Sequence, residues 1–144
     1  WYSKSSSSAV RPFPLRKRNQ LLHIFSNPTF MDSLPIINRS YALYKAIIEI
    51  NATLEKRWKY GIGLSLENSI LDCMEILIMA KNAPKTLKAP YLIKAVAKLE
   101  SASLKLRLFL ELKLTNETRI FQLQAVIAEI GRMLGGWLKA AQSA

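Results

Sequence analysis

Apolar residues recur at helical spacing along the C-terminal part of the chain. Read backward from Trp137 in steps of three and four residues, they form one unbroken seam, made of Leu134, Ile130, Ile127, Leu123 and Ile120. Because residues three and four apart lie on one face of a helix, this seam predicts a helix that packs in a bundle. Thr115 and Asn116 supply an N-cap for it, and Glu117 places an acid in its first turn.

Three earlier segments have the same character. The first spans residues 31–57, enters at Leu34-Pro35, and carries two adjacent apolar stripes that indicate burial over a wide arc. The second spans about residues 63–82 and the third about residues 90–114, each with an apolar seam of its own. Short connections favour antiparallel neighbours, so the sequence predicts an all-α fold, an antiparallel four-helix bundle over residues 31–144.

Glycines interrupt the last predicted helix at Gly131, Gly135 and Gly136. Each glycine costs about 1 kcal/mol relative to alanine inside a helix, so a compensating contact is expected. Gly131 and Gly135 share a stripe with Ala128, and this small-residue strip, with Trp137 nearby, is predicted to let a second helix pack closely. The alternative is that the glycines merely fray the helix end, which fits Gly135 and Gly136 better than Gly131.

Residues 1–30 differ in composition from the rest of the chain. They hold five basic residues and no acidic one, with a serine run at residues 5–8, then Pro12 and Pro14, and the cluster Arg16-Lys17-Arg18. We expect this basic Ser/Pro-rich tail to be disordered, or to lie upstream of the natural start, because Met31 follows directly. A basic arm that binds nucleic acid is the alternative.

Composition narrows the possible chemistry. The single cysteine, Cys73, falls on the seam of the second helix, and the single histidine, His23, lies in the tail. Structural zinc and Cys/His or Ser/His/Asp catalysis need more of these residues, so we expect no metal, no cofactor and no enzymatic activity. No uncharged apolar run reaches the roughly 18 residues of a membrane-spanning helix, so we expect a cytoplasmic protein without a membrane partner.

Basic side chains recur at helical spacing on the third and fourth predicted helices. The candidate phosphate contacts are Lys94, Lys98, Lys105, Arg107, Arg132 and Lys139. With a net charge of +11, they favour a polyanionic partner, and nucleic acid is the commoner kind. No aromatic residue is interleaved with them, so binding to RNA or DNA is expected to be electrostatic and weakly sequence-specific. The alternative is an ordinary solvated helix face.

Three stretches carry a resemblance to a known family. They are the glycine-rich ending at residues 130–139 (Ile-Gly-Arg-Met-Leu-Gly-Gly-Trp-Leu-Lys), the opening Leu34-Pro35-Ile36-Ile37, and residues 63–72 (Gly-Leu-Ser-Leu-Glu-Asn-Ser-Ile-Leu-Asp). Together they resemble the accessory variability determinant (Avd) family of bacterial diversity-generating retroelements, over residues 31–144. All but the glycine-rich ending would also suit the related four-helix-bundle proteins encoded within ribosomal RNA intervening sequences.

The resemblance implies a function. Avd proteins are non-enzymatic four-helix bundles that assemble as barrel-shaped homopentamers, bind nucleic acid and the retroelement's reverse transcriptase, and support mutagenic retrohoming. The chain departs from the family in residues 1–30, and its acids Glu67, Asp72 and Glu75 make the second helix a poor candidate for RNA contact. A structural assembly protein of the intervening-sequence type, without a retroelement role, is the alternative.

Overall fold

The structure, a computed structural model, describes residues 34–143, so the predicted tail at residues 1–30 lies outside the described part. Within residues 34–143 the long helices are α4 (Pro35–Asn51), α6 (Leu64–Asn82), α7 (Lys85–Glu111) and α8 (Glu117–Gln142). The short helix α5 (Lys56–Trp58) and the π-helix η1 (Lys59–Gly63) connect α4 to α6, and no strand occurs in this range. The expected all-α fold is confirmed.

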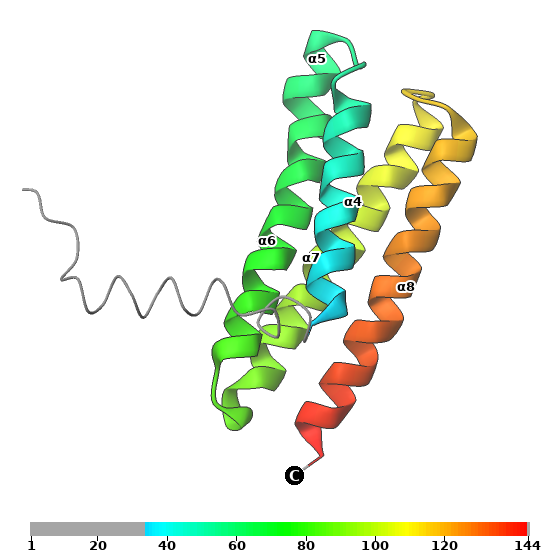
Figure 1. The fold of residues 1–144 in the computed structure, drawn as a ribbon. Helices are drawn as coiled ribbons and strands as arrows, with labels where there is room; N and C mark the ends of the chain where they lie inside the picture. Colours follow the sequence, from blue (N-terminus) through cyan, green and yellow to red (C-terminus); the bar gives the residue numbers. More distant parts are fainter. Residues whose placement is uncertain (1–33, 144) are drawn as a thin grey trace, which may run out of the picture. The chain divides into compact units, whose positions relative to one another are not determined.

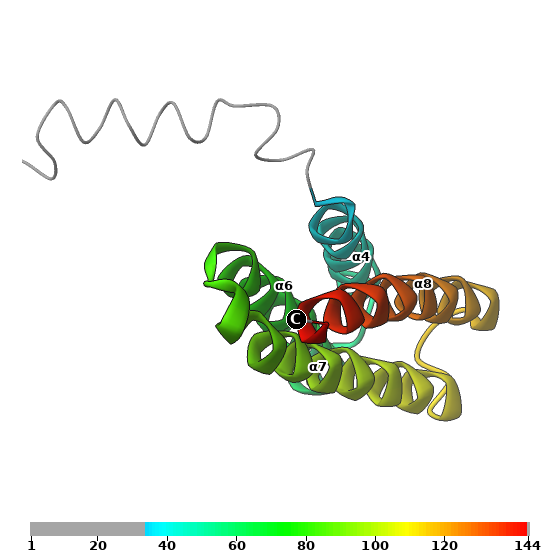
Figure 2. The ribbon, with the colours of Figure 1, turned by 90° about the horizontal axis from the view of Figure 1, so that it is seen from below.

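The long helices lie side by side, and successive ones run in alternating directions (Figure 1). Helix α6 packs on α7, and α7 packs on α8. Viewed from below, the end of α8 lies beside α6 and α7, so it reaches the same end as the α6–α7 connection (Figure 2). The fold is therefore bundle-like, with the start of α4 and the end of α8 on the side of that connection.

Apolar seams from the four long helices meet in one core. The predicted seam of α8 is buried, and Trp137 is half-buried and packs against the core. Cys73 is buried as expected, with its thiol 3.7 Å from the Ala95 carbonyl oxygen of α7. The largest fully buried side chains come from every long helix and include Leu43, Ile47, Leu66, Leu77, Leu106, Phe109, Ile120 and Ile130.

Two helix boundaries differ from the prediction. Helix α4 ends at Asn51 and not near Arg57, because the Asn51 side chain turns to α6 and the Thr53 hydroxyl donates to the Ile50 carbonyl at 2.7 Å. Helix α7 begins at Lys85 and therefore contains Pro90, the residue at which we expected it to start. Pro90 has no N–H to donate to the carbonyl four residues earlier, and its ring crowds that carbonyl, which lies in the first turn of α7.

Close backbone approach occurs at a glycine other than those predicted. A Cβ on Gly63 would stand 2.9 Å from Asn51 Oδ1 and 3.1 Å from the Trp58 carbonyl oxygen, so this position requires glycine. A Cβ on Gly131 would meet Leu99 at 3.8 Å, an ordinary contact, and one on Gly135 would meet no described atom within 4 Å. Within the chain, the small-residue strip therefore does not bring a second helix unusually near.

Candidate nucleic-acid interface

Acidic residues are absent from every described segment that reaches the end of the bundle with the α6–α7 connection. These segments are residues 35–48, 76–99 and 130–143. They carry Arg39, Lys45, Lys81, Lys85, Lys88, Lys94, Lys98, Arg132 and Lys139. We refer to them as the acid-free half, and their formal charge is +9 from nine Lys/Arg and no Asp/Glu.

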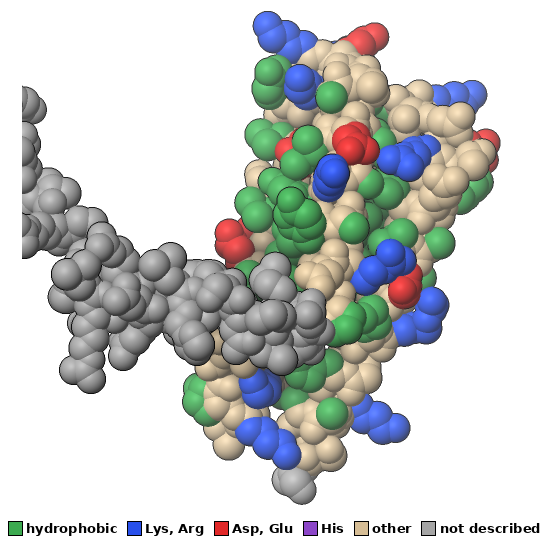
Figure 3. All heavy atoms as spheres, in the orientation of Figure 1, with side chains coloured by type: hydrophobic (Ala, Val, Ile, Leu, Met, Phe, Trp, Pro, Cys, Tyr) green, Lys and Arg blue, Asp and Glu red, His purple; other side chains and the backbone are tan. Residues whose placement is uncertain are grey.

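The other half of the described chain is close to neutral. Residues 49–75 and 100–129 hold seven Lys/Arg and nine Asp/Glu, a formal charge of −2. On the face seen in Figure 3, acidic side chains lie in the upper and middle parts, and only basic ones appear near the lower end. Such clustering of one sign concentrates the electrostatic potential at one end, which favours a polyanion there.

Most of the end surface comes from helix termini. Lys81 lies in the last turn of α6 and Lys139 in the last turn of α8. Lys88 Nζ donates to the Ala80 carbonyl at 2.8 Å and to the Lys81 carbonyl at 3.0 Å, so it caps α6 from the start of α7. Cations at helix C-termini are favoured by the helix dipole, and here the capping bonds also hold one of them in place.

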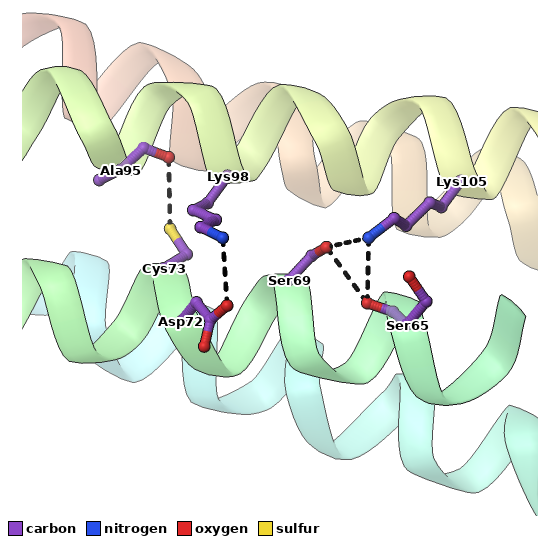
Figure 4. A network of polar contacts seen from close by, with 7 residues as sticks. All are labelled: Ser65, Ser69, Asp72, Cys73, Ala95, Lys98 and Lys105. Atoms are coloured by element: carbon purple, nitrogen blue, oxygen red, sulfur yellow. Dashed lines mark hydrogen bonds and ion pairs between the residues drawn. The ribbon is translucent and has the colours of Figure 1, made fainter. Parts of the chain in front are cut away.

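Of the three aligned lysines of α7, Lys98 and Lys105 point toward α6 (Figure 4). Lys98 Nζ lies 3.2 Å from Asp72 Oδ2. Lys105 Nζ donates to Ser69 Oγ at 2.6 Å and to the Ser65 carbonyl at 3.2 Å. Lys94 is exposed, so of the three it is the one best placed for a ligand.

The environment of Lys105 also differs from that of a solvated lysine. Burial lowers the pKa of its ammonium below the usual 10.5, and Lys98 lowers it further, whereas Asp72 raises it. A partly buried ammonium that already donates to two protein oxygens gains less free energy from contact with a phosphate than a solvated ammonium does. The structure thus assigns Lys98 and Lys105 to the contact between α6 and α7; their predicted role in phosphate binding stays a prediction.

The remaining predicted phosphate contacts also divide into paired and exposed side chains. Arg107 is paired with Glu111 one turn along α7, with Nε 3.1 Å from the carboxylate, and it lies outside the acid-free half. Arg132 and Lys139 are exposed and lie within it. Glu129, the acid closest to Arg132 along the chain, is in an ion pair with Arg39 of α4.

The acids of α6 do not form one patch. Glu67 accepts a hydrogen bond from Asn51 Nδ2 on the α4 side, and Asp72 pairs with Lys98 on the α7 side. Both carboxylates thus connect helices. Among the described residues, no group of three or more His, Cys, Asp or Glu is placed to hold a metal ion.

Sequence reasoning missed Lys81, Lys85 and Lys88. The signal was present, because residues 76–99 form a run of 24 residues with five lysines and no acid. The run forms one basic surface only because α6 and α7 fold back on each other and the end of α8 lies beside them. Alignment along single helices, which selected Lys98 and Lys105, does not reveal it.

The fold and charge distribution define the class of protein: a basic protein, all-helical over residues 34–143, with one end whose described segments carry no acid. Comparison with models of known protein families finds no match, and comparison with curated protein sequences finds no relative. None of the helices within residues 34–143 is both long and apolar enough to cross a membrane.

Proposed function

We propose that this protein is a non-enzymatic accessory protein that binds nucleic acid through the acid-free half of its bundle. The observation that carries the proposal is the charge of +9 on that half against −2 on the other. Contacts to phosphates release counterions and need no base readout, so the ligand class is RNA or DNA of any sequence. The contacts come from Lys81, Lys85, Lys94, Arg132 and Lys139.

A pair of double variants tests this proposal. Arg132→Gln with Lys139→Gln removes two charges from the acid-free half, and Arg107→Gln with Arg119→Gln removes two from the other half. The first pair should weaken binding to unrelated RNA and DNA alike, and should reduce the slope of log affinity against log salt by about 0.7 to 0.9 for each lost phosphate contact.

The second pair keeps the same net charge as the first and is the matched control. It should leave the slope close to that of the wild type, because Arg107 and Arg119 lie near Glu111 and Glu49. Equal effects of the two pairs would mean that total charge, and not the acid-free half, governs binding. Fluorescence anisotropy at several salt concentrations measures both, and circular dichroism checks the fold.

The resemblance to the Avd family supplies the biological setting of the proposal. In that setting the chain is an antiparallel four-helix bundle that acts in the bacterial cytoplasm with a retroelement reverse transcriptase on template RNA and its cDNA. The test is the DNA that flanks its gene, which should encode a reverse transcriptase and a template and variable repeat pair. Flanking ribosomal RNA sequence would instead favour the alternative, a structural assembly protein of the intervening-sequence type.

The proposal includes assembly as a homo-oligomer of five subunits, a number that comes from the resemblance. Exposed apolar side chains along the outer face of α7 support self-association: Ile93 is 53% exposed, Leu104 65% and Leu108 38%. Light scattering at micromolar concentration should give a pentamer mass, and Leu104→Glu should lower it. If Ile78→Glu on α6 lowers the mass instead, assembly uses another face; a wild-type monomer would contradict the proposal.

A further inference from the structure

Basic and aromatic residues alternate at the corner between α4 and α6. The sequence Lys56-Arg57-Trp58-Lys59-Tyr60 forms α5 and the start of η1, and we call it the basic-aromatic corner. It lies at the end of the bundle away from the α6–α7 connection, near the label α5 in Figure 1. The acid-free half therefore does not account for it.

The side chains of this corner are arranged in two cation–aromatic pairs. The guanidinium carbon of Arg57 lies 4.2 Å from the centre of the Trp58 ring, and Lys59 Nζ lies 5.7 Å from the centre of the Tyr60 ring. Trp58 also packs against the core, so it anchors Arg57. Tyr60 is 62% exposed, so most of its ring remains open to a ligand.

Local backbone geometry explains why Tyr60 projects outward. The chain kinks at Gly61, whose dihedral angles are not helical, and a Cβ there would meet no described atom within 4 Å. Space is therefore available beside Tyr60.

A hollow of about 280 Å³ lies next to the corner, between the end of α4 and the α7–α8 connection. Its lining includes Trp58, Leu112 and Lys113, and also the acid Glu55. Lys113 adopts a left-handed backbone conformation, with φ 54°. It adds a cation from the opposite connection, so the charged groups near the aromatic rings come from two parts of the chain.

We propose that the basic-aromatic corner binds single-stranded nucleic acid by stacking one base on Tyr60, with Arg57 and Lys59 contacting the flanking phosphates. Open aromatic rings among cations are the combination by which single strands are bound without sequence preference. A duplex offers no unstacked base, so the corner selects single strands. This inference rests on the proposed binding of nucleic acid and adds the form of nucleic acid that is preferred.

Removing the bases from the ligand separates stacking from phosphate contact. The full chain is titrated by anisotropy with labelled oligodeoxythymidylate of about 15 nucleotides and with an abasic strand of equal length. The wild type should bind the strand with bases more tightly, and Tyr60→Ser should reduce that preference by about tenfold, as expected for one stacked base. Tyr60→Phe keeps the ring and should retain the preference.

Phe121→Ser is the matched control, because Phe121 is 54% exposed on α8, lies outside the acid-free half, and has no cation pair of this kind among the described contacts. Its ratio of affinities for the two strands should equal that of the wild type. Equal binding of both strands by the wild type, or a preference that persists in Tyr60→Ser, overturns the inference and leaves phosphate binding intact. Binding of neither strand overturns the inference and the proposed function together.

Discussion

Asn51 and Gly63 join the end of α4 to the start of α6 through a single side chain. Asn51 Nδ2 donates to the Gly63 carbonyl at 2.8 Å and also to Glu67 Oε2 at 2.6 Å. Asn51 is 2% exposed and its bond to Gly63 is buried, where an unpaired amide N–H or carbonyl would be costly; its own Oδ1 has no partner among the described residues. The contact explains both the end of α4 and the need for glycine at position 63.

Gly63→Ala should therefore destabilise the protein by about 1–3 kcal/mol, the usual cost of overpacking. The added methyl group would stand 2.9 Å from Asn51 Oδ1 and 3.1 Å from the Trp58 carbonyl, and a backbone carbonyl has little room to shift. Urea denaturation measures the effect. Gly135→Ala is the control: with no described atom within 4 Å, it should stabilise by about 0.5–1 kcal/mol. Stabilisation by both variants would contradict the proposed crowding at Gly63.

Asn116 is the N-cap of α8, as the sequence predicted. Its Oδ1 accepts hydrogen bonds from the backbone N–H of Thr118 at 2.8 Å and of Arg119 at 3.4 Å. Asn116→Ala should lower the free energy of unfolding by about 1 kcal/mol, and Asn116→Asp should retain the cap. Thermal denaturation of the two variants separates loss of the cap from a general effect of substitution; equal losses would contradict the capping role.

The Cys73 thiol gives a dependence of stability on pH. Burial raises the pKa of Cys73 from 9.0 to about 11, so the folded state holds its proton more tightly than the unfolded state. The resulting stabilisation is complete below pH 9 and is lost as the pH rises toward 11. Relative to Cys73→Ala, the wild type should lose about 2 kcal/mol between pH 8 and 11. Parallel stability curves for the two proteins would contradict this.

Much of the fold was predictable because burial follows periodicity. The seam from Ile120 to Leu134 could be read directly, and every member of it is buried. The end of α4 could not be read in this way, since it depends on a hydrogen bond between residues twelve apart in the chain, Asn51 and Gly63. Local pattern carries no information about such a partner.

The candidate site was predictable only in part, for a related reason. Periodicity places Lys94, Lys98 and Lys105 on one face of α7 but does not tell whether that face meets solvent or another helix. Ser65, Ser69 and Asp72 of α6 decide this, and their positions depend on how α6 and α7 are rotated about their axes. Lys81, Lys85 and Lys88 lie around the α6–α7 connection, so their clustering can be recognised only when the position of that connection is known.

Lys94 and Lys105 should therefore behave differently when each is replaced by glutamine. Lys94 is exposed in the acid-free half, with its Nζ 6.0 Å from the centre of the Tyr91 ring, so Lys94→Gln should weaken nucleic-acid binding and leave stability nearly unchanged. Lys105→Gln removes the donor to Ser69 and Ser65 and should lower the free energy of unfolding by about 0.5–1.5 kcal/mol.

The two measurements together decide which lysines of α7 contact the ligand. Ser69→Ala removes the partner of Lys105 without changing charge, so its effect on stability should overlap with that of Lys105→Gln and the two should not add in the double variant. Affinity at fixed salt should be the same for Lys105→Gln, Ser69→Ala and the wild type. If Lys105→Gln instead weakens binding as much as Lys94→Gln and leaves urea denaturation unchanged, the α7 face is open to nucleic acid and its contact with α6 is dispensable.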